Sequence, residues 1–226
     1  MNKINHLAII MDGNQRWSKK NKISLEKAYN KGFEKLLEVT NYCIKKNINY
    51  LTVYALSTEN IERKSVNLIF DLIKKKYKKL LNDISKSNLI KIKIIGEKKN
   101  LSRSLFNILD EVEKNTKNQS KINLNIAFNY GTDEEVINIL KKSLKIGYKP
   151  EEINTKIIKS FMYLKDTPDP DILVRTGGFH RLSNFLLLNL KYTELFFTKT
   201  LWPDITINEI NDILNSYLSI ERKYGL

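Results

Sequence analysis

The chain has 226 residues, of which 42% are hydrophobic, and a formal net charge of +14. This length and apolar content suit one domain with a sizeable core better than two small ones. The positive charge favours an anionic partner, such as nucleic acid, a membrane surface or a phosphate-bearing substrate. The lysines are scattered along the whole chain, however, which fits compositional drift equally well. Because no basic stripe is interleaved with aromatic residues, we expect no nucleic-acid partner.

Cysteine usage and hydropathy restrict the compartment. Cys43 is the only cysteine, which excludes an intramolecular disulfide and a thiolate metal cluster. The apolar run at residues 7–11 is too short for the core of a signal peptide. No window of the sequence reaches the roughly 20 apolar residues of a membrane span. We therefore expect a cytoplasmic protein, with peripheral contact to the inner face of the membrane as an open alternative.

Short apolar runs alternate with longer segments of helical period, which is the pattern of a parallel sheet with flanking helices. We predict an α/β fold in which residues 1–226 form a single domain with a mostly parallel six-stranded sheet flanked by helices. The expected strands are residues 7–11, 50–56, 90–95, 122–129, 172–175 and 194–198.

Two helices are expected from their apolar spacing. Residues 25–44 place apolar side chains at i, i+3 and i+4, which predicts an amphipathic helix on the sheet. Cys43 falls within that stripe, so we expect a buried, inert thiol. A second helix is expected over residues 65–85, with Leu68 and Leu72 on an additional apolar face. Core packing, a dimer contact or an apolar ligand channel would each cover that face.

Two capping boxes predict further helix starts. Thr132 pairs with Glu135, and Thr206 pairs with Glu209, at the spacing that lets side chain and backbone exchange hydrogen bonds. Gly147 supplies a plausible stop for the first of these helices.

Ligands of parallel α/β sheets bind where strands end and helices begin, and polar residues stand at four such places. The first is DGNQRW, residues 12–17. A glycine after a strand lets the backbone approach a ligand, and N–H groups at a helix start form an anion cradle. Asp12 would repel a bare phosphate there but would suit a magnesium ion that bridges to it. An Asx-turn that merely redirects the chain explains Asp12 and Gly13 about equally well.

The second and third polar segments are LSTENIER, residues 56–63, and LVRTGGFHRLSNF, residues 173–185. The segment LSTENIER is weak evidence alone, because loops are usually polar. In LVRTGGFHRLSNF, two arginines and Ser183 surround an expected strand end. Guanidinium groups match phosphate oxygens, so we favour a diphosphate clamp over a solvated face.

The fourth segment is YTELFFTKTLWPD, residues 192–204. Glu194 precedes an apolar run, and a carboxylate drawn toward a buried edge needs a metal or an arginine as its partner. Together the four segments could bring Arg16, Arg175 and Arg181, a glycine cradle and two carboxylates into one site. Such a site favours a polyanionic substrate carried on magnesium.

The segments MDGNQRW, YALSTEN, NIAFNYG, RTGGFHRLSNF, ELFFTKTLWPD and ERKYG resemble, in order and spacing, the signature blocks of the cis-prenyltransferases. The likeness extends over residues 6–226, and it is strongest to bacterial members of the family. It implies a homodimeric, magnesium-dependent α/β enzyme of cis-prenyltransferase type. Such an enzyme condenses farnesyl diphosphate with successive isopentenyl diphosphates in cis. The product, undecaprenyl diphosphate, partitions to the membrane and serves as the lipid carrier of cell-wall sugars.

The resemblance also implies residue roles. Asp12 would be the essential acid on the magnesium ion, and Glu194, from the partner region of the dimer, would complete the metal site. Asn60 would position the isopentenyl group, since an amide is a poor base and a diphosphate oxygen can take the proton. The implied substrate-binding residues are Gly13, Asn14, Gln15, Arg16 and Trp17 for the allylic diphosphate, Ser57, Thr58, Glu59 and Arg63 near the substrates, and Arg175, Arg181 and Ser183, with Leu182, for isopentenyl diphosphate.

The chain departs from the family pattern at several positions. Leu25 and Tyr29 stand where an arginine and a histidine usually reach the allylic diphosphate. Ile61 replaces an aromatic residue, and Phe179 replaces the acid of the usual RTGGEHR block. A noncatalytic or altered-specificity subunit is therefore the alternative. Retention of the arginines and of both carboxylates argues against it, because a scaffold would not need them.

Overall fold

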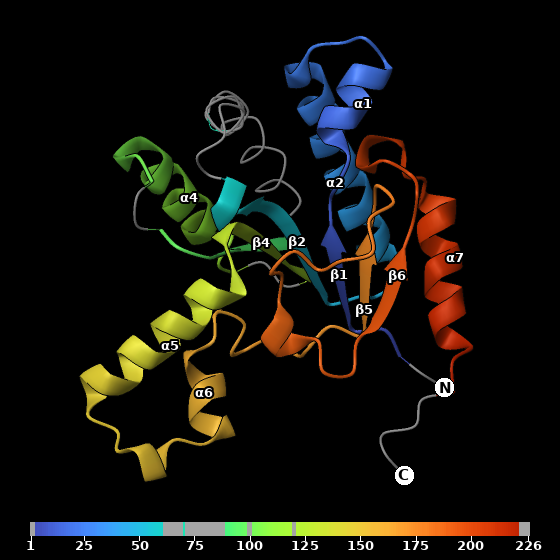
Figure 1. Ribbon diagram of the computed structural model, residues 1–226. Coiled ribbons are helices and arrows are strands. Elements are labelled where there is room, and N and C mark those ends of the chain that lie inside the picture. The colour runs from blue at the N-terminus through green and yellow to red at the C-terminus, as the bar shows by residue number, and fades with distance from the viewer. Residues whose placement is uncertain (1–2, 61–69, 71–88, 99–100, 119–120, 222–226) are drawn as a thin grey trace.

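The computed structural model describes residues 3–60, 70, 89–98, 101–118 and 121–221, and its centre is one six-stranded sheet (Figure 1). The strand order is β3-β4-β2-β1-β5-β6, and all five pairings are parallel. The predicted sheet is confirmed, with every strand boundary within one residue of its expected place. The strands are β1 (His6–Ile10), β2 (Tyr50–Ser57), β3 (Ile90–Ile95), β4 (Ile122–Tyr130), β5 (Ile172–Arg175) and β6 (Glu194–Phe197).

Three amphipathic helices cover one face of the sheet: α2 (Leu25–Lys45), α4 (Arg103–Asn115) and α7 (Ile207–Leu218). Their leucines at 36, 109 and 214 join the strand residues in one buried cluster. Figure 1 shows α7 beside β6 and α4 toward the opposite end of the sheet. Burial of apolar surface between helix and sheet is the main driving force for this layer.

The opposite face carries a smaller, aromatic cluster. Tyr54 of β2 stacks on Phe185, with ring centroids 4.4 Å apart, and Tyr130 of β4 meets both rings edge-on. The further helices within the described ranges are α1 (Asn14–Lys20), α5 (Thr132–Ile146) and α6 (Thr155–Phe161), with single 3-10 turns at Thr58–Asn60, Pro150–Glu152, Leu187–Asn189 and Trp202–Asp204.

The helix expected over residues 25–44 is confirmed as α2. Ser24 caps its start by accepting a hydrogen bond from the Lys27 N–H at 3.2 Å. Cys43 is fully buried, and this burial raises the pKa of its thiol to about 12, as expected for an inert side chain. Of the helix expected over residues 65–85, only Phe70 is described, so Leu68 and Leu72 lie outside the described residues.

The predicted helix signals are partly confirmed. Thr206 caps α7 by accepting from the Glu209 N–H at 3.1 Å. The reciprocal half of the box is not made, because the Glu209 carboxylate accepts from the Thr198 hydroxyl. Gly147 ends α5 in the left-handed conformation, with φ 88°, as predicted.

The predicted capping box at the start of α5 is wrong. Gly131 occupies the cap position, and Thr132 is already helical. The Thr132 hydroxyl donates instead to the Asn184 carbonyl at 3.1 Å, and the buried Glu135 carboxylate accepts from the Tyr130 hydroxyl. Tertiary partners have therefore taken both side chains away from the helix end.

Among the described residues, no helix combines the length and apolar character needed to cross a bilayer.

A buried hydrogen-bond chain fixes the start of β1. His6 is fully buried; its Nδ1 lies 2.7 Å from the Pro168 carbonyl and its Nε2 lies 2.7 Å from the Thr52 hydroxyl. A carbonyl can only accept, so Nδ1 donates and Nε2 accepts from Thr52. The Thr52 oxygen in turn accepts from Asn125 at 3.0 Å. The network therefore requires a neutral imidazole.

Stability should consequently fall in mild acid. Burial lowers the pKa of His6 from 6.5 to about 4, against the opposing hydrogen bond to Pro168. The unfolded chain thus binds a proton that the folded chain does not, so stability is full above pH 6.5 and is lost as pH falls toward 4. We expect this residue to cost about 2 kcal/mol of unfolding free energy between about pH 7.5 and about pH 5. Urea unfolding at both pH values measures it.

The matched control is His6→Gln, which cannot titrate in this range. Its unfolding free energy should change less between the two pH values than that of the wild type. Equal changes in the two proteins would contradict the assignment.

Candidate active site

Asp12 lies at the topological switch point of the sheet, where successive strands are added on opposite sides of β1. β1 is flanked by β2 on one side and by β5 on the other, and Ile10 pairs with Arg175 at the carboxyl ends of β1 and β5. Ligand crevices of open α/β sheets form at such switch points. Asp12, two residues past the end of β1, and Arg175, the last residue of β5, therefore meet at this edge.

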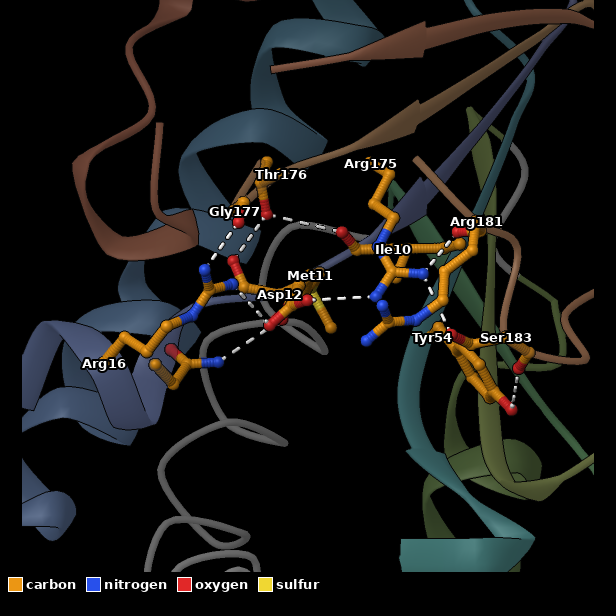
Figure 2. Close-up of polar contacts among 11 residues, drawn as sticks. Ile10, Met11, Asp12, Arg16, Tyr54, Arg175, Thr176, Gly177, Arg181 and Ser183 are labelled. Atoms are coloured by element: carbon orange, nitrogen blue, oxygen red, sulfur yellow. Dashed lines mark hydrogen bonds and ion pairs between the residues drawn. The ribbon is translucent and has the colours of Figure 1, made fainter. Parts of the chain in front are cut away.

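The Asp12 carboxylate bridges two arginines (Figure 2). Its Oδ1 accepts from Arg16 Nη2 at 3.0 Å, and its Oδ2 accepts from Arg175 Nη2 at 3.1 Å. Arg175 is only 4% exposed, whereas Asp12 is 27% exposed and Arg16 is 41% exposed. The ion pair with Arg175 is thus largely shielded from water, while the Asp12 side chain remains partly open to solvent.

Arg16 reaches Asp12 because α1 starts immediately after it. Gly13 caps α1 with φ 123°, and a Cβ there would lie 2.9 Å from the Leu201 side chain, so only glycine fits. Asp12 and Arg16 are then four residues apart, at the spacing of neighbouring side chains on a helix. Arg16 Nη1 also donates to the Gly177 carbonyl at 2.6 Å, which ties α1 to the chain beyond β5.

Arg175 is held from the opposite side by the segment that follows it. Its Nη1 donates to Ser183 Oγ at 2.9 Å and to the Arg181 carbonyl. Ser183 lies in the left-handed region, with φ 50°, as this sharp return of the chain requires. The expected cluster of Arg175, Arg181 and Ser183 therefore exists as one unit (Figure 2).

A cleft of about 680 Å³ opens above these groups, and most of the predicted site residues line it. They come from the ends of β1, β2 and β5 and from the loops that follow. The predicted residues that line the cleft are Asp12, Gly13, Asn14, Gln15, Arg16, Ser57, Glu59, Asn60, Arg175, Arg181 and Ser183.

Besides Glu194, four predicted residues lie outside the cleft lining or outside the described chain. The Trp17 indole N–H donates to Asp204, and Leu182 packs against the aromatic cluster of the sheet. The Thr58 hydroxyl lies against Gly131, where a Cβ would be 2.7 Å away. Arg63 is outside the described residues. Contacts of these residues with substrate stay predictions.

Glu194 does not meet Asp12 within one chain. It begins β6 in register with Ile172, whereas Phe197 at the end of β6 pairs with Arg175. Three residues of strand therefore separate Glu194 from the cleft edge, or about 10 Å at the usual rise. In the described part of the chain, no group of three His, Cys, Asp or Glu side chains could hold a metal ion. A metal role for Glu194 stays a prediction that requires a second subunit.

Among the described residues, sequence reasoning missed two polar side chains of the cleft, Tyr54 and Asn184. Tyr54 looked like an ordinary strand residue, yet its hydroxyl donates to the carbonyls of Tyr130 at 3.0 Å and Ser183 at 3.2 Å. Asn184 donates to Glu59 Oε1 at 3.2 Å. Its place directly after the arginine cluster was the one available signal. Tyr29 and Phe179, noted only as departures from the family pattern, also line the cleft.

The electrostatics of the cleft favour a polyanion. Burial would raise the pKa of the Glu59 carboxyl, but hydrogen bonds from its own backbone, Asn184, Ser57 and Thr58 outweigh burial and lower that pKa. In the part of the chain that the structure describes, Glu59 and Asp12 are the carboxylates that line the cleft with its three arginines. Guanidinium groups exceed carboxylates here, and their paired donors suit phosphate oxygens.

Gly177 permits the contact between Arg16 and Asp12. Its φ is 87°, and a Cβ would collide with Arg16 Nη2 and lie 3.1 Å from the Asp12 carbonyl. Gly147 has almost the same φ, 88°, but a Cβ there would meet nothing within 4 Å. Alanine substitutions at the two positions therefore separate the cost of backbone strain from the cost of a steric collision.

We expect Gly147→Ala to lower the unfolding free energy by about 1 kcal/mol through backbone strain alone. Gly177→Ala should cost about 1 kcal/mol more, because Arg16 must also give up its partly exposed contacts with the Gly177 carbonyl and Asp12. Chemical denaturation of both variants measures the difference. Equal losses would show that Gly177 matters only for its conformation.

Comparisons with known proteins all point to one family. Residues 10–225 match the family described as "Putative undecaprenyl diphosphate synthase". The isoprenyl transferase of Aquifex aeolicus is 38% identical over 226 residues, covering 97% of this chain and 95% of that protein. The isoprenyl transferase of Fusobacterium nucleatum is 39% identical over 222 residues, with the same coverage of 97% and 95%.

Solved structures agree. Lavandulyl diphosphate synthase from Lavandula x intermedia, in complex with dimethylallyl diphosphate, superposes with a TM-score of 0.92 at 26% identity, covering 99% of this chain and 98% of that one. A probable undecaprenyl diphosphate synthase from Campylobacter jejuni gives a TM-score of 0.84 at 28% identity, with both chains fully covered. With the α/β fold and the cleft described above, these matches show that the chain belongs to the undecaprenyl diphosphate synthase family of isoprenyl transferases, the cis-prenyltransferases that its sequence motifs resemble.

Proposed function

We propose that the cleft binds farnesyl diphosphate beside isopentenyl diphosphate and joins them in cis, and that repeated addition yields undecaprenyl diphosphate. The observation that carries this proposal is the position of Asp12 between Arg16 and Arg175 on one shared cleft. The lavender enzyme, which has the same fold at 26% identity, was solved with dimethylallyl diphosphate. An allylic diphosphate is therefore a reasonable substrate class for this chain also.

The two ends of the cleft suit two diphosphates. At one end, the Trp17 backbone N–H donates the first hydrogen bond of α1, to the Gly13 carbonyl at 2.8 Å. The backbone N–H groups before Trp17 therefore have no acceptor within the helix, and they lie beside Arg16. We assign this end to the allylic diphosphate, with Gly13, Asn14 and Gln15. We assign the other end, with Arg175, Arg181 and Ser183, to isopentenyl diphosphate.

Asp12 fits the role of a magnesium ligand. Its carboxylate is partly exposed at the cleft, and Mg²⁺ is typically held by one or two carboxylates together with substrate phosphates. A bound Mg²⁺ would neutralise charge that develops on the departing diphosphate. We propose Glu194 of the partner subunit as a further ligand.

The proposed reaction breaks one bond and forms another, and residues of the cleft assist both changes. The allylic C–O bond breaks, a C–C bond forms to the isopentenyl double bond, and a proton leaves the isopentenyl unit. Arg16 stabilises the negative charge on the departing diphosphate better than water does, because it is already in place. Asn60 positions the isopentenyl group, while an oxygen of the released diphosphate accepts the proton.

Residues 1–226 would act as one catalytic domain in the cytoplasm. The long hydrocarbon chain of the product would leave water for the membrane, because apolar surface is unfavourable in water. We therefore propose that the enzyme works in peripheral contact with the inner face of the membrane.

The test is a product assay. Purified protein with farnesyl diphosphate, labelled isopentenyl diphosphate and Mg²⁺ should yield labelled long-chain polyprenyl diphosphate, sized by chromatography after removal of the phosphates. A chelator should abolish product, and added Mg²⁺ should restore it. Absence of any chain extension would overturn the proposed function.

Asp12→Asn should lower kcat by at least about 100-fold in the same assay, the typical loss on removing a preorganised electrostatic group. The matched control is Asp204→Asn. Asp204 also contacts α1, through Trp17 and Lys20, but it does not line the cleft. Its activity should stay within about threefold of wild type.

The proposed homodimer has a candidate surface on α5. Leu140, Leu144 and Ile146 are 52%, 75% and 60% exposed. Leu187, 46% exposed, lies beside the start of the same helix, where its N–H donates to Thr132 Oγ1 at 3.1 Å. Large exposed apolar patches commonly mark protein interfaces. We propose that a second copy of the chain covers this apolar patch.

Leu144→Asp should therefore shift the protein from dimer to monomer in light scattering after size exclusion, because burying a carboxylate in an apolar contact is costly. Lys141→Asp changes an exposed residue of the same helix and should leave the dimer intact. A dimer that tolerates Leu144→Asp would place the interface elsewhere.

A further inference from the structure

Phe179 is held at the cleft by a pair of glycines. Gly177 and Gly178 have φ of 87° and 79°, and their N–H groups donate to the carbonyls of Thr200 and Thr198, both at 2.8 Å. The loop is thereby fixed against the chain that follows β6. Phe179 comes directly after it, with its side chain 39% exposed and lining the cleft.

Three guanidinium groups surround the Phe179 ring. The Cζ atoms of Arg181, Arg16 and Arg175 lie 4.2, 4.7 and 5.7 Å from the ring centroid. All three distances fall within the range of about 6 Å for cation–π attraction. The arginines come from separate places in the chain: α1, the end of β5 and the loop after it. The ring is therefore a common contact of groups that the sequence keeps apart.

The three arginines differ in their other partners. Arg16 and Arg175 are each paired with Asp12. Arg181 makes no ion pair within the described ranges, and its guanidinium lies against the Phe179 ring. Of the three, Arg181 thus depends most on the ring for its position.

A neutral ring holds cations differently from a carboxylate. The face of an aromatic ring attracts a guanidinium without accepting its in-plane N–H bonds. The ring therefore adds no acceptor of its own, and the guanidinium donors that the protein's own oxygens do not already occupy stay available to an anion. A carboxylate at the same place would accept them and compete with a phosphate.

We propose that Phe179 is a positioning residue that holds Arg16, Arg175 and Arg181 together for diphosphate binding without adding an acceptor that would compete for their donors. The proposal deepens the proposed function and rests on it, because it takes these arginines as the diphosphate site. The ring touches arginines assigned to both diphosphates. Loss of the ring should therefore weaken the binding of both substrates.

The direct test is titration calorimetry of inorganic pyrophosphate without metal. Phe179→Leu keeps an apolar side chain but removes the ring, and it should raise the Kd about fivefold to thirtyfold, as expected for loss of one or two cation–π contacts. Phe179→Tyr keeps the ring and should bind within about twofold of wild type. An unchanged Kd in Phe179→Leu, or a Phe179→Tyr variant as weak as Phe179→Leu, would overturn the proposal.

A matched control guards against a general packing effect. Phe106 on α4 is also 39% exposed but does not line the cleft, so Phe106→Leu should leave the Kd unchanged. Thermal unfolding checks that each variant is folded. If Phe179→Leu is unfolded, Phe179→Met replaces it with the same expected loss.

Steady-state kinetics separate this inference from the proposed function. In Phe179→Leu the KM for both substrates should rise by a similar factor, with kcat within about threefold of wild type, because the ring acts on binding and not on the reacting atoms. If wild type forms no prenyl product yet the pyrophosphate affinity follows the ring, the proposed function fails and the positioning role stands. If wild type is active and neither KM nor Kd responds, the positioning role fails alone.

Discussion

The bridge from the Asp12 carboxylate to Arg16 and Arg175 is the interaction on which the cleft depends. Arg175 is almost fully buried, and a buried guanidinium without a partner would be strongly destabilising. Asp12 supplies that partner and at the same time fixes Arg16 at the start of α1. One carboxylate thus connects the end of β1, the following helix and the end of β5, so the charged groups are in place before any substrate arrives.

This bridge sets a condition on the proposed chemistry. A carboxylate that ligates Mg²⁺ has less negative charge to share with two arginines. A diphosphate brings anionic oxygens to the same place, and guanidinium groups bind these oxygens at least as well as they bind a carboxylate. A Mg²⁺ ion on Asp12 is therefore compatible with the bridge when a diphosphate enters as well, since the metal alone would leave the two guanidinium groups without an anionic partner.

The sheet and the main part of the cleft could be predicted from the sequence because both follow from local patterns. Apolar runs between helical segments identify parallel strands, and polar residues just after such runs must share one edge of the sheet. Asp12 and Arg175 were placed correctly by that reasoning. Glu194 lies at the start of its strand instead, three residues from the edge that its sequence neighbours suggested. The capping box at Thr132 failed because distant partners compete for the same side chains, and the spacing of residues carries no information about them.

Phe179 shows a further limit of the same kind. In the sequence it is an aromatic residue in a loop, and its main property is the absence of an acid that the family usually has there. Its contacts are set by Arg16, more than 160 residues away in the chain, as much as by its neighbours Arg175 and Arg181. With a neutral residue at this place, Asp12 and Glu59 are the carboxylates that face the three arginines among the described residues of the cleft. A carboxylate at residue 179 would cancel the remaining positive charge, so in this chain the attraction for a metal-free polyanion depends on a side chain that carries no charge itself.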